Sequence, residues 1–203
     1  MAIISFGGVQ AIASSSASQP VFGSTLSAAV AITPDKFSNN NGPGSNQTQA
    51  IVPVATGTGK FFSVGQQVAV GPAAAFKPSS VTAAAAADVG IIKAISTDNI
   101  TVQGLQKNHA SGEFFVVNEV VANVHICPVG GGSANDALYI GNSQTVSSTD
   151  PSVFDIIAIP AHPGLPTYVH DSAAVGGSQP YNTSEYWIAG TSTDTFVARY
   201  TQV

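Results

Sequence analysis

Short runs of β-branched and aromatic residues, separated by glycine, proline and Asx turns, dominate the chain from residue 50 to residue 128. Runs of this length and composition are typical of β-strands. We expect strands at residues 51–55, 61–70, 90–96, 100–105 and 113–126. Thr97-Asp98-Asn99 predicts a hairpin turn between two of them, because Asx residues tolerate the left-handed backbone of such turns. Together these strands predict a small antiparallel β-barrel or sandwich over residues 51–129.

The same pattern resumes after the Gly-Gly-Gly-Ser run at residues 130–133, which predicts a joint between two domains. We expect further strands at residues 137–140, 154–159, 167–169, 186–189 and 195–200. In the last of these, Phe196, Ala198 and Tyr200 alternate with Val197 and Arg199, as in a strand with one buried face. Residues 130–203 therefore predict a second small β domain.

Residues 1–50 differ, because low-complexity runs at residues 13–18 and 38–45 flank a single apolar segment at residues 21–32. Such a segment cannot form a core alone, but it can add a strand to the main domain or to a neighbouring subunit. We predict an extended N-terminal arm over residues 1–50, in which Val21 and Phe22 are candidate interface residues. A disordered terminus is an equal alternative for residues 1–20.

The alanine run at residues 83–87 favours a helix, but it is shorter than the roughly 12 residues that an isolated helix needs. We expect a loop or a single turn there. The predicted fold class is therefore all-β, with small antiparallel β-barrel or sandwich modules and an extended N-terminal arm.

Charged residues make up only 8% of the 203-residue chain, against about 25% in an ordinary soluble domain. A weakly charged exterior gives little repulsion against self-association, which favours a protein held against copies of itself or other subunits. The formal net charge is -5, and the six Lys and Arg residues are scattered singly, so we expect no nucleic-acid partner. No stretch approaches the roughly 18 apolar residues of a membrane span, and the first residues lack a secretory-signal pattern, so we expect no membrane partner.

Residues that could carry chemistry are few. The four histidines, His109, His125, His162 and His170, lie outside any known catalytic or zinc-binding motif. His125 and the single cysteine, Cys127, could offer two ligands from one strand face to a soft metal, but a buried thiol beside an imidazole is the favoured interpretation. His162 and His170-Asp171 belong to a proline-rich stretch that favours a surface loop over a cation site. We therefore predict no catalytic residue, no metal site, no cofactor and no enzymatic activity.

Gly57-Thr58-Gly59-Lys60 resembles the end of a phosphate-binding loop, but Phe61 and Phe62 follow where that loop requires Ser or Thr at the start of a helix. We interpret the match as accidental.

Aromatic residues gather near the C-terminal end of the chain: Tyr181, Tyr186, Trp187, Phe196 and Tyr200. Aromatic faces fill cores, form protein–protein contacts and stack on sugars. A core role is favoured here. An inter-subunit contact through Tyr181, Tyr186 and Trp187 is the second alternative, and a glycan-binding platform is the third.

Several segments resemble modules of tailed-bacteriophage virion proteins. Residues 62–70 (FSVGQQVAV), 89–96 (VGIIKAIS), 99–105 (NITVQGL) and 109–113 (HASGE) look like a β-barrel module common in these proteins. Residues 138–143 (LYIGNS) and 186–191 (YWIAGT) look like virion knob or decoration domains. The chain departs from the barrel pattern at Gln66, where an Asp is usual and would make a turn hydrogen bond.

This resemblance implies a capsid decoration (cement) protein, located in the virion, that binds the assembled shell and stabilises it without catalysis. Its expected partners are the major capsid protein or other virion proteins and further copies of itself, with a trimer among the possible oligomers. The alternatives are a minor collar, tail or fibre component and a glycan- or receptor-binding β module. A hydrolase would require two histidines, or Asp155 and Asp171, to meet in one pocket.

Overall fold

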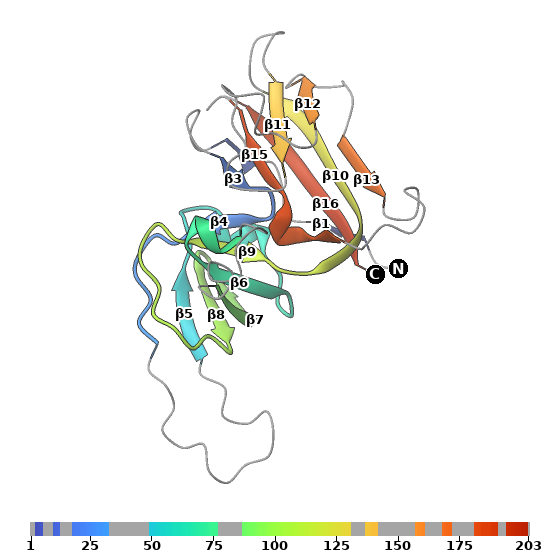
Figure 1. Ribbon diagram of the computed structural model, residues 1–203. Helices are drawn as coiled ribbons and strands as arrows, with labels where there is room; N and C mark the ends of the chain where they lie inside the picture. Colours follow the sequence, from blue (N-terminus) through green and yellow to red (C-terminus); the bar gives the residue numbers. More distant parts are fainter. Residues whose placement is uncertain are drawn as a thin grey trace.

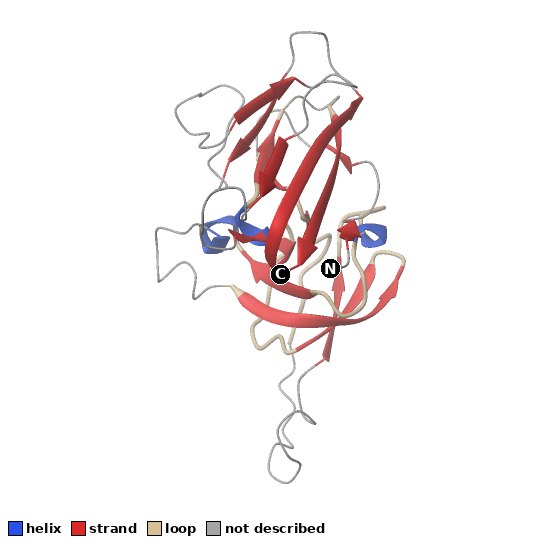
Figure 2. Ribbon diagram, turned by 90° about the vertical axis from the view of Figure 1, so that its right-hand side faces the viewer, coloured by secondary structure: helices blue, strands red, loops and turns tan. Residues whose placement is uncertain are grey.

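The computed structural model describes residues 3–5, 10–12, 18–32, 49–76, 87–130, 137–141, 157–160, 168–171, 181–190 and 194–202. In these residues the protein is all-β with antiparallel sheets, which confirms the predicted fold class. Helical structure within them consists of three short 3-10 turns: η1 (Gly59–Phe61), η2 (Ala73–Phe76) and η4 (Thr183–Glu185). These turns lie near the level where the two parts of the molecule meet (Figure 2). The alanine run at residues 83–87 falls, except for Ala87, outside the described residues.

Six strands form one curled sheet in the order β4-β9-β6-β7-β8-β5 (Figure 1). They are β4 (Gly23–Thr25), β5 (Gln49–Pro53), β6 (Gln67–Gly71), β7 (Asp88–Ser96), β8 (Asn99–Gln103) and β9 (Phe114–Val117). The sheet curls into a half-barrel, and the residues that follow its two edge strands, β4 and β5, contact each other. There Leu26 and Val54 form a bridge, and the Ala55 N–H donates to the Thr25 carbonyl at 2.9 Å. We call this sheet the barrel.

Most predicted strands of the barrel are confirmed with small shifts of their ends, but the predicted strand at residues 61–70 is only half right. Phe61 lies in η1, and β6 begins at Gln67. Phe61 and Phe62 are both buried, which a strand with one buried face cannot achieve for consecutive residues. Gly65 then turns the chain with a φ of +94°, a conformation that favours glycine.

The remaining strands form two further sheets (Figure 1). The first has the order β1-β16-β10-β13; in addition, β2 pairs with the start of β16 and β14 pairs with the start of β10. Its strands are β1 (Ile3–Ser5), β2 (Gln10–Ala11), β10 (Val120–Gly130), β13 (Tyr168–Asp171), β14 (Tyr181–Asn182) and β16 (Thr195–Gln202). The second has the order β12-β11-β15-β3; its strands are β3 (Gln19–Pro20), β11 (Ala137–Gly141), β12 (Ile157–Pro160) and β15 (Trp187–Ala189). Residues from both sheets and from the barrel share one hydrophobic cluster.

The chain passes from the barrel to the other half at Asn118 and Glu119, whereas the sequence predicted a boundary near residue 130. The predicted strand at residues 113–126 is in fact two strands, β9 in the barrel and β10 in the other sheet. β10 continues to Gly130, which pairs with Thr195 of β16. The glycine run therefore begins at the last residue of a strand of the second half, and only two polar residues, Asn118 and Glu119, separate the halves.

Of the two roles considered for the extended arm over residues 1–50, the described residues take the first, which is to add strands to their own chain. β1 and β2 pair with β16, β3 pairs with β15, and β4 pairs with β9. The N-terminal segment therefore adds strands to all three sheets of its own chain. It also buries Ile12, Val21, Phe22 and Leu26, because the rest of the chain leaves space for these side chains in its core.

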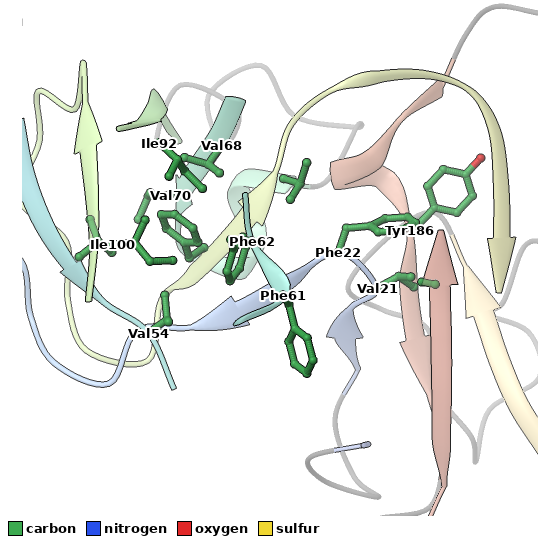
Figure 3. Close-up of a cluster of buried hydrophobic side chains, with 14 of the residues drawn as sticks. Val21, Phe22, Val54, Phe61, Phe62, Val68, Val70, Ile92, Ile100 and Tyr186 are labelled. Carbon is green, nitrogen blue, oxygen red and sulfur yellow. The ribbon is translucent and has the colours of Figure 1, made fainter. Parts of the chain in front are cut away.

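Val21 and Phe22 join the two halves of the molecule (Figure 3). The Val21 N–H donates to the Tyr186 carbonyl at 2.9 Å, and the Phe22 carbonyl accepts from the Val117 N–H at 2.8 Å. The Phe22 ring meets Tyr186 and Tyr200 edge to face, with centroid distances of 6.2 and 5.3 Å. Such contacts add about 0.5–1.5 kcal/mol beyond area burial.

Candidate interaction surface

One face of the barrel is exposed and carries mostly uncharged side chains, with the exposed Lys93 in the same strand β7. In β5, β6, β7 and β8 the inward residues, among them Val52, Val68, Ile92 and Ile100, are fully buried. The alternate positions point outward, and cross-strand pairing sets them side by side. We call the following set the outer barrel face: Gln49, Ile51, Gln67, Val89, Ile91, Ala94, Thr101 and Gln103.

Three aliphatic side chains on this face are unusually exposed. The exposed fractions are 66% for Ile51, 44% for Val89 and 39% for Ile91. Ile51 lies opposite Thr101, and Ile91 lies between Gln103 and Gln67. Single exposed aliphatic residues are common, but three on one face with a single exposed lysine favour a contact surface.

The second half of the molecule packs on the outward side of the barrel at β6 and β9. Trp187 of β15 is fully buried in a cluster with Ala69 and Val116, the outward residues of β6 and β9. Its ring contacts Phe114 edge to face at 5.1 Å, and its Nε1–H donates to the Ser184 carbonyl at 3.1 Å. At the other end, the outward residues of β5, β7 and β8 named above are exposed or half-buried.

The acidic side chains of the described barrel bind groups of the same protein. Asp88 accepts from the N–H groups of Gln106 and Lys107, Glu113 contacts His109, and Glu119 accepts from Tyr200. By contrast Lys60, Lys93 and Lys107 are exposed. The described barrel therefore carries few charges at its surface: exposed lysines, and carboxylates that are already bonded to groups of the same protein.

Asp98 explains the resemblance to a phosphate loop. Its carboxylate accepts from the N–H groups of Gly57 and Gly59, each at 2.9 Å, so these amides bind a side chain of the same protein. A Cβ at Gly59 would overlap the Thr97 carbonyl, so the close approach of the two turns requires glycine. The predicted hairpin turn at 97–99 is confirmed, although Thr97 has the positive φ, 55°, and Asp98 provides the hydrogen bonds.

These hydrogen bonds predict an acid-dependent contribution to stability. Bonds from Gly57 and then Gly59 lower the pKa of the Asp98 carboxyl below its ordinary value of 3.8. A lowered folded pKa means that this stabilisation is complete above pH 3.8 and is lost as the pH falls through the folded pKa. Asp98→Asn should therefore lower the urea midpoint at neutral pH, and the difference from wild type should shrink below pH 3.8. A difference that stays constant down to about pH 2 would contradict this assignment.

Gln66 makes the turn hydrogen bond that the departure from the usual Asp had placed in doubt. Its Oε1 accepts from the Ser63 N–H at 2.7 Å, and its Nε2 donates to the Tyr200 hydroxyl at 2.8 Å. Tyr200 in turn donates to Glu119 at 2.7 Å. Burial, with this bond to Glu119, raises the pKa of Tyr200 well above its ordinary value. The Gln66 side chain, which is longer than that of Asp, therefore links the turn at residues 63–66 to the last strand, β16.

His109 is buried and contacts residues from three segments of the chain, a role that its sequence context did not reveal. Its Nδ1 lies 2.9 Å from Glu113 Oε2, and its Nε2 lies 3.6 Å from Asp88 Oδ2. Its backbone pairs with Val30 of the N-terminal segment in both directions. Both ring nitrogens face carboxylates, whereas a catalytic base must direct one nitrogen at a nucleophile.

Four of the five predicted interface residues fill the core of the chain. Val21, Phe22 and Trp187 are fully buried and Tyr186 is 2% exposed. These side chains have no surface to offer a partner in this fold, and the core role favoured for Tyr186, Trp187, Phe196 and Tyr200 is confirmed. Tyr181 lies in β14, and its side chain is outside the description.

His125 and Cys127 do share one face of a strand, as predicted, but that face is open. His125 is exposed and Cys127 is half-buried, so the favoured interpretation of a buried thiol beside an imidazole is wrong. His162 lies outside the described residues. His170 and Asp171 lie in β13 and not in a loop, and their side chains are not described.

Comparisons with known proteins give no relative from which a function could be inferred, so the proposal below rests on the features described above. Neither protein-family models, nor curated proteins, nor solved structures give a match to this chain. Among the residues described above, no group of three or more His, Cys, Asp or Glu side chains could hold a metal ion. In the same residues no helix is long and apolar enough to cross a membrane.

Proposed function

We propose that this protein is a non-catalytic structural component of a tailed-phage virion, which binds the assembled capsid as a decoration protein and stabilises it. The outer barrel face is the observation that carries the proposal. It would contact the major capsid protein or another virion protein, and a subunit that binds only the assembled shell shifts the equilibrium toward that shell. The collar, tail or fibre is the alternative position for the same surface.

The chemistry of the outer barrel face supports a protein partner. Uncharged side chains lose little when water is removed from them, so a face of amides, hydroxyls and aliphatic groups suits a large repeated interface. Lys93, exposed on β7, has no partner among the described residues and could meet a carboxylate of the neighbouring protein. Burial of Trp187 removes the ring on which a glycan platform would depend.

Binding to purified particles from the source organism tests this proposal. Particles stripped of the protein are mixed with the wild type or with the double variant Ile51→Lys and Ile91→Lys, and co-sedimentation gives the affinity. The two lysines would have to lose their water in the interface, so the affinity should fall at least about tenfold. The same variant should keep the wild-type melting temperature, because both positions are exposed.

Val120→Lys is the matched control, since Val120 is 49% exposed but starts β10 in the other half. It should bind like the wild type. If the wild type fails to bind particles, the proposed function is wrong. If the double variant binds as tightly as the wild type, the outer barrel face is not the contact.

A further inference from the structure

A shallow groove crosses the outward face of the second half, on β10 and β16. It has a volume of about 370 Å³ and is lined by His125, Cys127, Val129, Val197 and Arg199. The ladder places Arg199 directly opposite His125 and Val197 directly opposite Cys127. On the same strands Ile126, Ala198 and Tyr200 point the other way, into the core. The groove therefore has a rigid floor, fixed by strands that are anchored on their far side.

Arg199 is the only arginine of the chain, and it lines this groove. Both ion pairs among the described side chains involve His109, so Arg199 has no carboxylate partner among them. The guanidinium presents a planar set of donors that fits a carboxylate with two parallel hydrogen bonds. His125 beside it adds a further ring donor.

The other residues that line the groove determine which carboxylate-containing molecules fit it. Val129 is 39% exposed, and together with Val197 and Cys127 it makes the groove apolar next to the cation. A polyanion such as nucleic acid needs a run of cations, whereas this chain has a net charge of -5. From His125 to Val129 the strand extends roughly 13 Å, the length of about four residues. This length suits an extended peptide better than a small free acid.

We propose that this groove binds an extended segment of a partner protein in which one acidic residue is flanked by aliphatic residues. The carboxylate pairs with Arg199, and the flanking side chains cover Val129 and Val197. This site is separate from the outer barrel face and does not depend on the virion assignment. In an assembled particle it would give one subunit two contacts, one on each half.

Titration of the isotope-labelled protein, followed by NMR, tests the groove with defined probes. The probes are acetyl-Val-Asp-Val-amide, its Asn counterpart and sodium acetate. The Asp peptide should give saturable shifts confined to β10 and β16, with an affinity at least about fivefold above that of the Asn peptide. Acetate should bind more weakly than the Asp peptide, because it cannot cover the valines.

Two variants complete the test. Arg199→Gln should abolish the preference for Asp over Asn, whereas Lys93→Gln, which removes another exposed cation on the barrel, should leave it unchanged. His125→Gln serves as a second groove variant if Arg199→Gln melts below the wild type. Equal binding of the Asp and Asn peptides, equal binding of acetate, shifts outside β10 and β16, or no saturation would each overturn the proposal.

Discussion

Replacing Phe22 with alanine should lower the free energy of unfolding by about 3–5 kcal/mol, the usual cost of removing a phenyl ring from a packed core. Phe22 is fully buried and contacts the rings of Tyr186 and Tyr200, which belong to the second half of the molecule. Its carbonyl binds the end of β9 in the barrel. The cavity would therefore open where the halves meet, and urea unfolding followed by tryptophan fluorescence measures the loss.

Ile51→Ala is the control for this measurement, because it removes an aliphatic side chain from an exposed position. Its effect should stay within about 0.5 kcal/mol. A Phe22→Ala protein as stable as Ile51→Ala would show that residues 18–25 are not part of the core, and it would restore the free-arm interpretation.

Trp187→Ala should destabilise the protein by about 3–5 kcal/mol, again because a large buried ring is lost. The variant also leaves the Ser184 carbonyl without the indole N–H and opens space beside Phe114 and Phe76. Chemical unfolding followed by circular dichroism measures this change, since the variant has no tryptophan. Trp187→Phe should recover part of the loss, because it refills most of the space without the hydrogen bond.

The same variant separates the core role of Trp187 from a glycan-binding role. If Trp187 were an exposed sugar platform, Trp187→Ala would lose glycan binding and keep its full stability. A stability within about 0.5 kcal/mol of wild type would contradict the packing of this ring.

The sequence predicted the fold class and most of the strands of the barrel, because alternation and turn residues are local signals. The outward Ile51 and Ile91 and the inward Val52 and Ile92 follow from the same alternation once the strands are placed. The sequence could not show that the outer barrel face stays uncovered. That depends on how the second half packs, and Trp187 covers only the β6 and β9 end.

Strand pairing between residues far apart in the sequence explains where the structure differs from the predictions. The pattern of residues 1–32 is that of a weak, interrupted segment, and nothing local reveals that β16, β15 and β9 each accept a strand from it. In the same way, Asn118 and Glu119 are a weaker local signal than the glycine run at 130–132, although the sheets separate at the former. The partners of Asp88 and Asp98 lie 18 to 41 residues away in sequence, so their internal roles were also hidden.

The copy number of this chain relative to the major shell protein, measured by quantitative mass spectrometry of purified particles from its source, tests the proposed function most directly. A surface subunit that binds a repeated lattice should be present at a ratio near one or a simple fraction of it. A few copies per particle would place the protein at a vertex, collar or tail instead. Absence from the particles would contradict the account that its outer barrel face is a virion contact.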